Sequence, residues 1–485
     1  MTSMPNPFDS ARFLARLGNI VGPRHLLTDP EELAPFLTDW RGRYSGGALA
    51  LARPGSTEET AALVRHCQLA GVPVVPQGGN TGLVGGATPD ARGHALIIQT
   101  RRLNHLRAID PINNTMIAEA GVTLAQARKF AQKAGRLFPL SLASEGSCQI
   151  GGNISTNAGG VQVLRYGAMR DLTLGLEAVL PDGEIWRGLN CLRKNNTGYD
   201  LKQLLIGAEG TLGIVTAAVL KLFPLPRHHL ACWLGLPSPT AALTLLSWMQ
   251  GIFDARLTAF ELICPRAFYL VQKHFPRLTP LPPAPWHVLC ELSDCADDEE
   301  SRLRTETEKF LAGHLANGIL QEAVLSRTEA ERARFWQWRE NISEAQKREG
   351  ISIKHDIALP LSRVPEFLER IVPRLEKNFP GICHTAFGHL GDGNLHFNLS
   401  MPEPEANARL IKREAEANRL VYDLVHELSG SISAEHGIGQ LKRALLPRYK
   451  TPTEITAMRA IKRALDPAGL MNPGKVLPDT DVLTT

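Results

Sequence analysis

The sequence predicts an α+β protein in which an α/β part is followed by an antiparallel sheet backed by helices. Residues 48–75 read as strand, helix and strand, which is typical of a βαβ-like unit. Residues 364–428 read instead as helix, strand, hairpin and long helix, an order that favours an antiparallel sheet. Between the two parts, Pro224-Leu225-Pro226 is a rigid break of the kind that separates domains.

Length and composition are those of a globular protein with two or three domains. The chain has 485 residues, of which 44% are hydrophobic and 21% charged. The net charge of +4 is dispersed, which excludes a strongly basic nucleic-acid-binding surface. Eight cysteines without a CxxC pair indicate reduced thiols in a cytosol-like compartment. Residues 1–22 fit neither a signal peptide nor a membrane span, so a cytoplasmic protein is expected.

Local signals mark the first helices. Residues 8–19 read as an amphipathic helix. Ser56 followed by Glu59 matches a capping box, in which each residue satisfies a backbone N–H of the other. Thr123 with Gln126 has the same spacing and predicts the start of a second helix.

A glycine-rich stretch, residues 76–86, follows the βαβ-like unit. Glycine lets a backbone curl so that several N–H groups point at one anion. The stretch is neither the dinucleotide-binding GxGxxG nor a P-loop, because its spacing differs and no Gly-Lys-Ser/Thr is present. A flexible surface loop is the alternative. The residues predicted to bind a phosphate-bearing cofactor here are Pro76, Gly78, Gly79, Asn80, Thr81, Gly82, Gly85 and Gly86.

Two further glycine-rich stretches, residues 144–160 and 207–215, combine glycine with small hydroxyl and amide side chains. Two glycine-rich loops from separate strands suit a ligand with two phosphates. The cofactor-binding residues predicted in these stretches are Ser144, Glu145, Gly146, Gly151, Gly152, Asn153, Ser155, Thr156, Asn157, Gly159, Gly160, Glu209, Gly210, Gly213 and Ile214.

Residues 387–398 read as a hairpin whose turn is Gly391-Asp-Gly-Asn394. If Leu390 pairs with Leu395, His389 lies opposite His396, with Cβ atoms roughly 5 Å apart. Both imidazoles could then hold one metal ion. Asn398 joins the same face because side chains alternate along a strand. A pair of ordinary surface histidines is the alternative.

Further candidates precede the hairpin. Residues 329–349 read as a helix, and Arg339 and Ser343 share one of its faces because they are four residues apart. In the strand that follows, Lys354 and Asp356 lie on the face opposite three isoleucines. Arg339 taken alone reads more readily as a partner in a surface ion pair.

The remaining elements are a charged helix at residues 297–314, a helix that Pro373 should kink or split, and a long helix at 403–428. Residues 431–434 then read as a strand that ends at Glu435.

Glu435 would complete a set of two histidines and one carboxylate, which leaves coordination positions open as catalytic sites require. Such a nitrogen and oxygen set does not exclude manganese, cobalt or ferrous iron. The alternative is that Glu435 and His436 cap a helix over residues 437–450.

The three glycine-rich stretches together resemble the PCMH-type FAD-binding domain of the vanillyl-alcohol-oxidase-like flavoproteins. The hairpin and the stretch Ser433–Gly439 resemble the D-2-hydroxyacid dehydrogenases of that superfamily, and among them the D-2-hydroxyglutarate dehydrogenases. The resemblance implies a two-subdomain FAD-binding domain, a substrate domain with an antiparallel sheet, and a small helical C-terminal part. The expected boundaries are 1–47 for an N-terminal helical segment, 48–224 for the FAD-binding domain, 225–428 for the substrate domain and 429–485 for the C-terminal segment, which carries Glu435 and His436.

The resemblance also implies the cofactors. The first stretch would cradle the FAD diphosphate, and the second would lie along the diphosphate and the ring. Some relatives attach flavin through a histidine near the position of Asn80, so the asparagine implies non-covalent FAD. His389, His396 and Glu435 are implied as ligands of a divalent metal, usually zinc.

For the substrate, the resemblance implies that His436 binds it and acts as the general base, and that Asn398 hydrogen bonds to it. Arg339, Ser343 and Lys354 match the group that grips the distal carboxylate of D-2-hydroxyglutarate.

The function expected is therefore FAD- and metal-dependent oxidation of D-2-hydroxyglutarate, with D-malate as a second candidate. D-lactate or glycolate is the alternative within the superfamily. A non-catalytic FAD electron-transfer subunit and an FAD-free metallohydrolase are alternatives of other classes. Because no nicotinamide fingerprint is visible, electrons are expected to leave to an electron-transfer flavoprotein or a quinone. A homodimer is also considered, and neither a nucleic acid nor a membrane span is expected.

Overall fold

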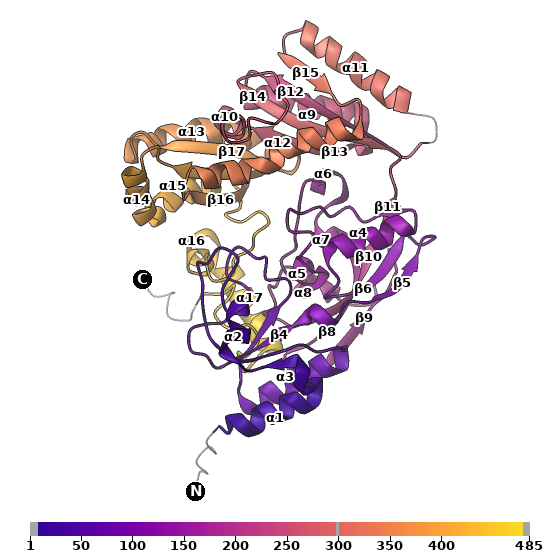
Figure 1. The fold of residues 1–485 in the computed structure, drawn as a ribbon, viewed down its shortest axis with the longest axis vertical. Coiled ribbons are helices and arrows are strands. Elements are labelled where there is room, and N and C mark those ends of the chain that lie inside the picture. Colours follow the sequence, from indigo (N-terminus) through magenta and orange to yellow (C-terminus); the bar gives the residue numbers. More distant parts are fainter. Residues whose placement is uncertain (1–7, 297–299, 479–485) are drawn as a thin grey trace. The chain divides into compact units, whose positions relative to one another are not determined.

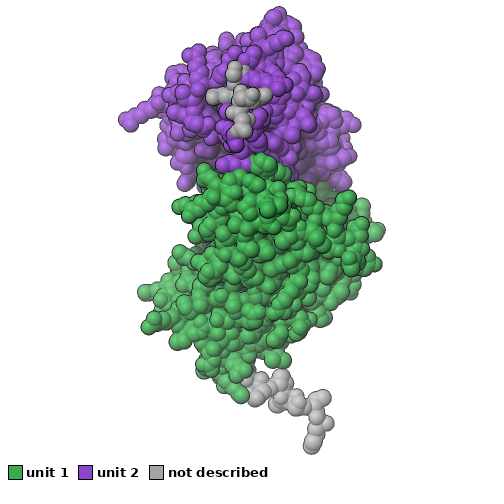
Figure 2. Space-filling model, turned by 90° about the vertical axis from the view of Figure 1, so that its right-hand side faces the viewer, with its two compact units in different colours: residues 1–158, 168–224, 436–485 green, residues 159–167, 225–435 purple. Residues whose placement is uncertain are grey.

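The computed structural model describes residues 8–296 and 300–478. The chain forms two compact units (Figures 1 and 2). Unit 1 consists of residues 1–158, 168–224 and 436–485, and unit 2 of residues 159–167 and 225–435. Helices and antiparallel sheets occur in both units, which confirms the predicted α+β class.

The first sheet of unit 1 has four strands, three of them parallel. In spatial order they are β1 (Leu26–Leu27), β2 (Ala48–Ala52), β4 (Ala95–Gln99) and β3 (Val74–Gln77). Helix α3 (Thr57–Ala70) connects β2 to β3, as the βαβ-like pattern predicts. Helix α1 (Ser10–Val21) packs on α3, and both cover this sheet with apolar side chains such as Leu17 and Leu63.

The helix caps follow the sequence signals closely. Ser56 accepts a hydrogen bond from the backbone N–H of Glu59 at 3.0 Å, but the Glu59 carboxylate accepts from Gly55 instead of from Ser56. Only half of that predicted box therefore forms. At α4 (Leu124–Lys133), Thr123 and Gln126 form the complete reciprocal box, which confirms the second prediction.

The second sheet of unit 1 is antiparallel throughout. In spatial order its strands are β5 (Leu106–Asp110), β6 (Thr115–Glu119), β10 (Ile214–Lys221), β8 (Thr173–Val179) and β9 (Ile185–Gly188). Short helices join these strands, namely α5 (Ile150–Ser155), α7 (Met169–Leu172) and α8 (Lys202–Leu205). A two-stranded pair, β7 (Arg136–Leu137) and β11 (Phe223–Pro224), completes the strands of this unit.

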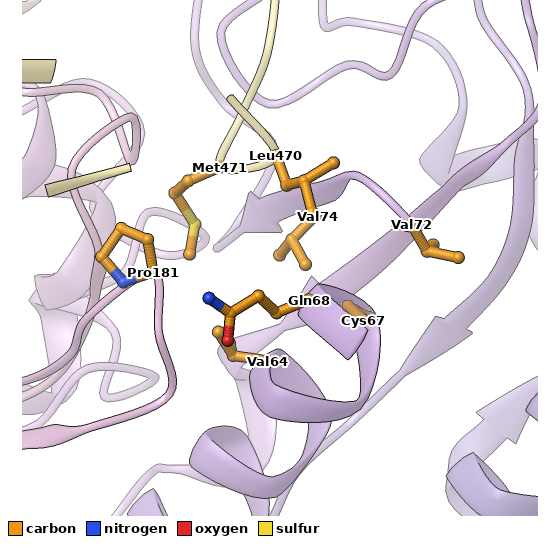
Figure 3. Close-up of a pocket in the computed structure, with 8 residues that line it drawn as sticks. All are labelled: Val64, Cys67, Gln68, Val72, Val74, Pro181, Leu470 and Met471. Atoms are coloured by element: carbon orange, nitrogen blue, oxygen red, sulfur yellow. The ribbon is translucent and has the colours of Figure 1, made fainter. Parts of the chain in front are cut away.

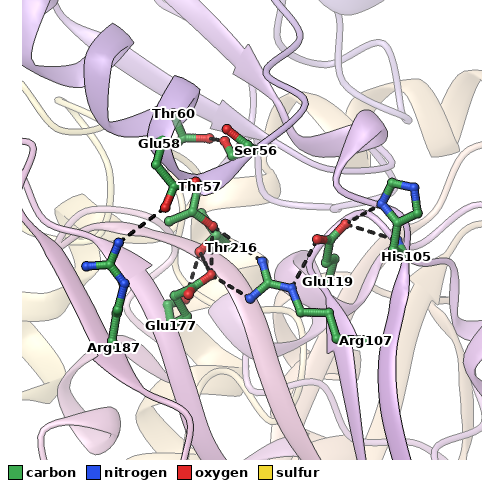
Figure 4. A network of polar contacts seen from close by, with 10 residues as sticks. All are labelled: Ser56, Thr57, Glu58, Thr60, His105, Arg107, Glu119, Glu177, Arg187 and Thr216. Atoms are coloured by element: carbon green, nitrogen blue, oxygen red, sulfur yellow. Dashed lines mark hydrogen bonds and ion pairs between the residues drawn. The ribbon is translucent and has the colours of Figure 1, made fainter.

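Arg107 connects the second sheet to α3 (Figure 4). Its guanidinium donates to Glu119 at 3.1 Å and to Glu177 at 3.0 Å, and both carboxylates are buried. Glu177 also accepts from the hydroxyl of Thr57, the first residue of α3, at 2.7 Å. One cation thus neutralises two carboxylates that would otherwise be costly to bury.

The C-terminal segment belongs to the edge of the first sheet. Met471 forms a parallel bridge with Val74, and the Val74 N–H donates to the carbonyl of Leu470 at 2.8 Å. Between these residues and α3 lies a small hollow, lined mainly by aliphatic side chains (Figure 3). Its volume of about 10 Å³ holds no more than one water molecule, so it is not a cofactor site. Helices α16 (Leu446–Tyr449) and α17 (Pro452–Leu465) belong to the same segment.

Unit 2 is built on a seven-stranded sheet in which every neighbouring pair is antiparallel. In spatial order its strands are β15 (Glu322–Leu325), β12 (His228–Leu236), β14 (Trp286–Asp294), β13 (Leu257–Ile263), β17 (Cys383–His389), β18 (Asn394–Ser400) and β16 (Ile353–Ala358). This sheet confirms the antiparallel sheet predicted for the second part of the chain.

Helices cover both faces of the large sheet. Helices α10 (Pro265–His274) and α12 (Glu329–Arg348) pack on the face that carries Trp233, whose ring contacts Phe268 and Trp338. The opposite face carries Phe397, which meets Phe367 of α13 in an edge-to-face contact. Helices α9 (Pro239–Phe253), α13 (Val364–Asn378) and α15 (Glu414–Glu427) cover that second face.

Some local predictions are wrong. Helix α13 continues through Pro373 as one helix, so the predicted split does not occur, and its other residues bury an apolar face. The expected long helix divides at Arg413 into α14 (Pro404–Lys412) and α15. Residues 431–434 form no strand, only a bridge between Ser431 and Ala358. Helix α11 covers Glu300–Ala316, and the predicted start at 297–299 lies outside the described residues.

Removing the Arg107 guanidinium should destabilise unit 1. Arg107→Ala removes the guanidinium that binds two buried carboxylates, of which Glu119 keeps its contact with His105. We expect the free energy of unfolding to fall by roughly 2–3 kcal/mol, between the values for surface and buried pairs. The urea unfolding midpoint measures this loss. Arg187→Ala, which removes an exposed pair with Glu58, should shift the midpoint little. Equal shifts for the two variants would contradict the role assigned to Arg107.

Candidate active site

The first glycine-rich stretch offers free backbone donors. Within the described part of the chain, no backbone N–H of residues 78–86 donates a hydrogen bond to another group. Amide side chains instead hold the carbonyls: Gln440 donates to Gly85 at 2.9 Å, and Asn472 donates to Gly86 at 2.9 Å. A run of N–H groups without internal acceptors is what a bound anion requires. The residues therefore fit a diphosphate.

Asn80 and Gly79 fix the shape of this stretch. Asn80 has a φ of 53°, and its side-chain amide donates to the carbonyl of Thr38 at 2.9 Å. A Cβ on Gly79 would lie 2.0 Å from the carbonyl oxygen of Ser147. The first and second glycine-rich stretches are therefore in direct backbone contact, and only glycine permits it.

The second stretch is partly helical, which corrects its prediction as a loop. Residues Ile150–Ser155 form α5, since Gly151 allows the helix to approach Ala120, where a Cβ would lie only 2.7 Å from the alanine methyl. The hydroxyls of Ser155 and Thr156 donate to carbonyls of the helix itself. Glu145 forms an ion pair with Arg128 of α4.

Two further residues of this stretch that were predicted to bind the cofactor also have other contacts. Asn157, with a φ of 48°, accepts a hydrogen bond from the backbone N–H of Arg170 at 2.8 Å. Gly159 belongs to unit 2, where an added Cβ would lie 3.6 Å from a carboxylate oxygen of Glu435.

The third stretch braces α5. The N–H groups of Gly207 and Glu209 donate to the carbonyls of Ile154 and Ser155, at 3.0 and 2.8 Å. The Glu209 carboxylate is buried and accepts from the backbone N–H groups of Ile438 and Gly439 at 2.7 and 2.8 Å. Burial raises the pKa of Glu209 in spite of these bonds. Its side chain thus anchors the C-terminal segment of unit 1.

The hairpin of unit 2 has a different register from the one predicted. Phe387, not His389, lies opposite His396, because Leu390–Asp392 form a 3-10 turn instead of pairing. The two histidines nevertheless stay on one face, with ring centroids 5.7 Å apart and nearly perpendicular planes. The expected proximity of the rings is therefore confirmed, although the predicted pairing is wrong.

Each histidine lies opposite a buried carboxylate on the neighbouring strand. Glu261 on β13 is the cross-strand partner of His389, and its Oε1 accepts from Nδ1 at 2.5 Å. Asp356 on β16 is the cross-strand partner of His396, with Oδ1 4.0 Å from Nδ1. Both carboxylates lie on the Nδ1 side of their rings, so each Nε2 remains as the ligand atom.

Glu261 also binds Arg339, whose Nε donates to Oε2 at 2.6 Å. The guanidinium lies 5.0 Å from the ring centroid of Phe387. Burial opposes ionisation of Glu261, but His389 and Arg339 outweigh it and lower its pKa to about 2. Burial likewise disfavours the charged His389, yet the Glu261 carboxylate raises its pKa to about 9.

Buried or half-buried side chains that could bind a metal lie around His396. Ligand atoms of Asp356, His396 and Glu435 lie within 4.8 Å of one another, and His396 Nε2 is 3.8 Å from Glu435 Oε1. The backbone N–H of Glu435 donates to Asp356 at 3.0 Å, which fixes the ligand loop. Burial raises the pKa of Glu435 to about 7 and that of Asp392 to about 6. This excess of buried carboxyl groups fits a divalent cation.

The predicted substrate residues lie on α12 and on the same sheet face. Asn398 donates to Gln346 at 2.9 Å and is the cross-strand partner of Lys354. Ser343 precedes Gln346 by three residues and therefore shares its side of the helix. Arg339 is buried, whereas Ser343 and Lys354 are exposed. His436 directly follows Glu435 in the chain.

Three functional candidates escaped the sequence reasoning: Glu261, Gln346 and the contact of Asp356 with His396. Glu261 is the one charged residue of the strand Leu257–Ile263, and a lone acid among apolar residues was the available signal. Nothing in the sequence marks Gln346, because its contact depends on how α12 lies on the sheet.

The glycine-rich unit and the unit with the carboxylate–histidine pairs both match known families. Residues 48–188 match the family described as FAD binding domain, and residues 225–476 match FAD linked oxidases, C-terminal domain. D-2-hydroxyglutarate dehydrogenase of Bos taurus, named as mitochondrial, is 38% identical over 96% of this chain and 83% of that protein. The Xanthomonas citri enzyme of the same name is 36% identical over 95% of each chain.

Solved structures agree on the fold. p-Cresol methylhydroxylase superposes with a TM-score of 0.74 at 16% identity, over 97% of both chains. Alkyldihydroxyacetonephosphate synthase superposes with a TM-score of 0.71 at 18% identity, over 97% of this chain and 86% of that one. At such low identity these likenesses show the fold alone.

The matches define the class first: this is an FAD-dependent oxidoreductase with a PCMH-type FAD-binding domain. The chain belongs to the family of D-2-hydroxyglutarate dehydrogenases, as the resemblance in the sequence predicted. It is a dehydrogenase that oxidises D-2-hydroxy acids with FAD. Among the described residues, no helix is both long and apolar enough to cross a bilayer.

Replacing Gly79 should separate the two contacting stretches and weaken FAD binding. In Gly79→Ala the added Cβ meets the Ser147 carbonyl oxygen at 2.0 Å, so the backbone must move. We expect a clearly lower flavin-to-protein absorbance ratio in the purified variant. Gly251→Ala in α9 has open space around its Cβ and should keep the wild-type ratio. Full FAD occupancy in Gly79→Ala would contradict the contribution of this contact.

Proposed function

We propose that the substrate is D-2-hydroxyglutarate and that its distal carboxylate binds between α12 and the sheet. The Gln346–Asn398 hydrogen bond carries this proposal. It holds the side of α12 that bears Ser343 against the strand pair that bears Lys354. The hydroxyl of Ser343 and the ammonium group of Lys354 thus flank the buried Gln346–Asn398 contact. Arg339 lies on the same helix, two turns before Gln346.

The charges favour a dicarboxylate. Arg339 uses Nε for Glu261, and its other guanidinium nitrogens remain for a substrate carboxylate. Lys354 adds a second cation on the same sheet face. A carboxylate bound beside the buried Arg339 needs such partners, since an unpaired anion there would be costly. D-malate is a shorter dicarboxylate that could bind to the same three side chains, Arg339, Ser343 and Lys354. D-lactate lacks the distal carboxylate and would gain no binding energy from them.

We further propose that His389, His396 and Glu435 hold a divalent metal, with zinc as the first candidate and Asp356 beside them. The Nδ1 contacts of both histidines support this proposal, because they leave Nε2 as the ligand atom. When bound, such an ion would polarise the substrate hydroxyl as a Lewis acid.

The other roles are assigned to residues of the chain. His436 takes the proton of the 2-hydroxyl on a ring nitrogen, as the general base. Asn398 hydrogen bonds to the substrate, and Arg339, Ser343 and Lys354 hold its far end so that C2 is aligned. FAD, bound without a covalent link through the cofactor-binding residues of the glycine-rich stretches, supplies at N5 the acceptor for the hydride of C2.

An electron-transfer flavoprotein or a quinone is the proposed acceptor of the electrons. A homodimer and a cytoplasmic location stay predictions. A non-catalytic electron-transfer subunit is disfavoured, because it would need neither the histidine–carboxylate pairs nor Arg339 bound to Glu261.

The proposal is tested by anaerobic reduction of the bound flavin. Purified protein is mixed with D- and L-2-hydroxyglutarate, D-malate and D-lactate, and bleaching of the flavin absorbance is followed, before and after chelation. We expect the fastest bleaching with D-2-hydroxyglutarate and its loss on metal removal. Equal rates with D-lactate would refute the dicarboxylate preference, and full bleaching after complete chelation would refute the metal.

Lys354→Met should weaken the binding of dicarboxylates selectively. Loss of one charge-assisted hydrogen bond, about 1.5–3 kcal/mol, corresponds to a KM for D-2-hydroxyglutarate about 10- to 100-fold higher. The kcat/KM for D-lactate should stay unchanged, because D-lactate has no distal carboxylate. Lys377→Met at the end of α13, a helix on the opposite sheet face, is the control and should leave both substrates unaffected. An equal loss for both substrates would argue against the proposed carboxylate contact.

His396→Ala should lose the metal and the activity but keep FAD, since the FAD-binding stretches 76–86 and 207–215 belong to unit 1. Metal and flavin contents of the purified variant measure the two effects separately. His384→Ala removes a histidine of the same hairpin that stacks on Phe397, on the opposite sheet face, and should retain the metal. Loss of FAD in His396→Ala would mean that the hairpin is structural.

A further inference from the structure

We infer that Glu261 is a positioning residue that fixes a metal-binding histidine and a substrate-binding arginine at the same time. The inference rests on the proposed function, because it takes His389 as a metal ligand and Arg339 as a substrate residue. It adds that metal affinity and substrate affinity depend on one buried carboxylate that touches neither ligand.

The first half of the argument is the contact with His389. Glu261 is fully buried, and its Oε1 accepts the Nδ1 proton of His389 at 2.5 Å. A ring nitrogen bound to a carboxylate keeps its proton, so a metal would displace the proton of the other nitrogen, Nε2, and bind there. The pairing of β13 with β17 sets the two residues directly opposite each other, so the backbone enforces this contact.

The second half is the contact with Arg339. Oε2 of the same carboxylate accepts from Arg339 Nε at 2.6 Å. This bond and the ring of Phe387, 5.0 Å from the guanidinium carbon, limit the positions that the guanidinium can take. Both oxygens of Glu261 therefore act as acceptors toward two site residues on different elements, β17 and α12.

A carboxylate suits this position and an amide does not. Glutamine offers one acceptor oxygen and one NH₂ donor, so it cannot accept from His389 and from Arg339 together. If the NH₂ group faces His389, the imidazole must accept at Nδ1 and carry its proton on Nε2, which blocks the metal. If it faces Arg339, two donors oppose each other and the guanidinium must move.

The same sheet face supplies a matched control. Glu291 on β14 is also buried and also binds an arginine of α12, Arg332 at 2.8 Å, seven residues before Arg339. Its remaining oxygen lies 3.7 Å from His229. Glu291 thus shares the strand environment, the burial and the helix contact of Glu261, but contacts none of the proposed site residues.

The experiment compares Glu261→Gln with Glu291→Gln in the full-length, FAD-loaded protein. Zinc affinity is measured by competition with a chromogenic chelator, and KM and kcat are measured for D-2-hydroxyglutarate. Flavin content and thermal unfolding report on the fold. We expect Glu261→Gln to lose about 10- to 100-fold in zinc affinity and to raise KM, whereas Glu291→Gln keeps both values.

Wild-type zinc affinity in Glu261→Gln, or an equal loss in both variants, would overturn the inference. If Glu261→Gln does not fold, Glu261→Asp retains the charge but is one methylene too short to reach both partners, and the same loss is expected. His396→Ala separates the two proposals. If it retains zinc, the metal site itself is wrong; if it loses zinc while Glu261→Gln binds normally, only the role of Glu261 fails.

Discussion

The contacts of α12 with one face of the seven-stranded sheet are the constraint on which the site of unit 2 depends. Three polar residues of this helix, seven positions apart, reach down to the sheet: Arg332 to Glu291, Arg339 to Glu261 and Gln346 to Asn398. Seven residues are almost two helical turns, so all three project from one side. The helix therefore crosses β14, β13 and β18 along a polar line embedded in aromatic packing. A shift of α12 would therefore move Arg339 and, through Glu261, disturb His389.

Buried acidic residues on the sheet require polar partners from α12. Glu261, Glu291 and Asp356 all lie on this sheet face, and each is nearly inaccessible to water. Buried carboxylates are tolerated only with cations or several donors. Glu291 accepts from Arg332 and Trp336 and lies 3.7 Å from His229, none of which is a proposed site residue. Glu261 and Asp356 are paired with His389 and His396, and in this way a stabilising requirement of the fold also orients potential ligands. In unit 1 the unsatisfied groups are donors and not acids. The backbone N–H groups of residues 78–86 have no acceptor within the described part of the chain.

Much of this could be read from the sequence, for local reasons. Helix caps such as Thr123–Gln126 and the βαβ-like unit depend on residues close together in the sequence, so local patterns predict them. The glycine-rich motifs predict the FAD-binding domain in the same way. One failure is local: the register of the hairpin differs because Leu390–Asp392 form a 3-10 turn. Other failures involve contacts distant in sequence, such as the close approach of Gly151 in α5 to Ala120. Glu261 lies 128 residues before His389, so no local pattern could join them.

The distinction between Glu261 and Glu291 suggests how a site can be built from a structural motif. Both acids satisfy the same rule, a buried carboxylate beneath an arginine of α12. They differ in their cross-strand partners: His389 on β17 lies opposite Glu261, whereas Ala231 on β12 and Ala259 on β13 lie opposite Glu291. Function at this face therefore needs no special backbone, because a regular antiparallel register suffices to place a histidine opposite an acid that the fold already holds. The specificity of the site then resides in which strand lies next to each acid.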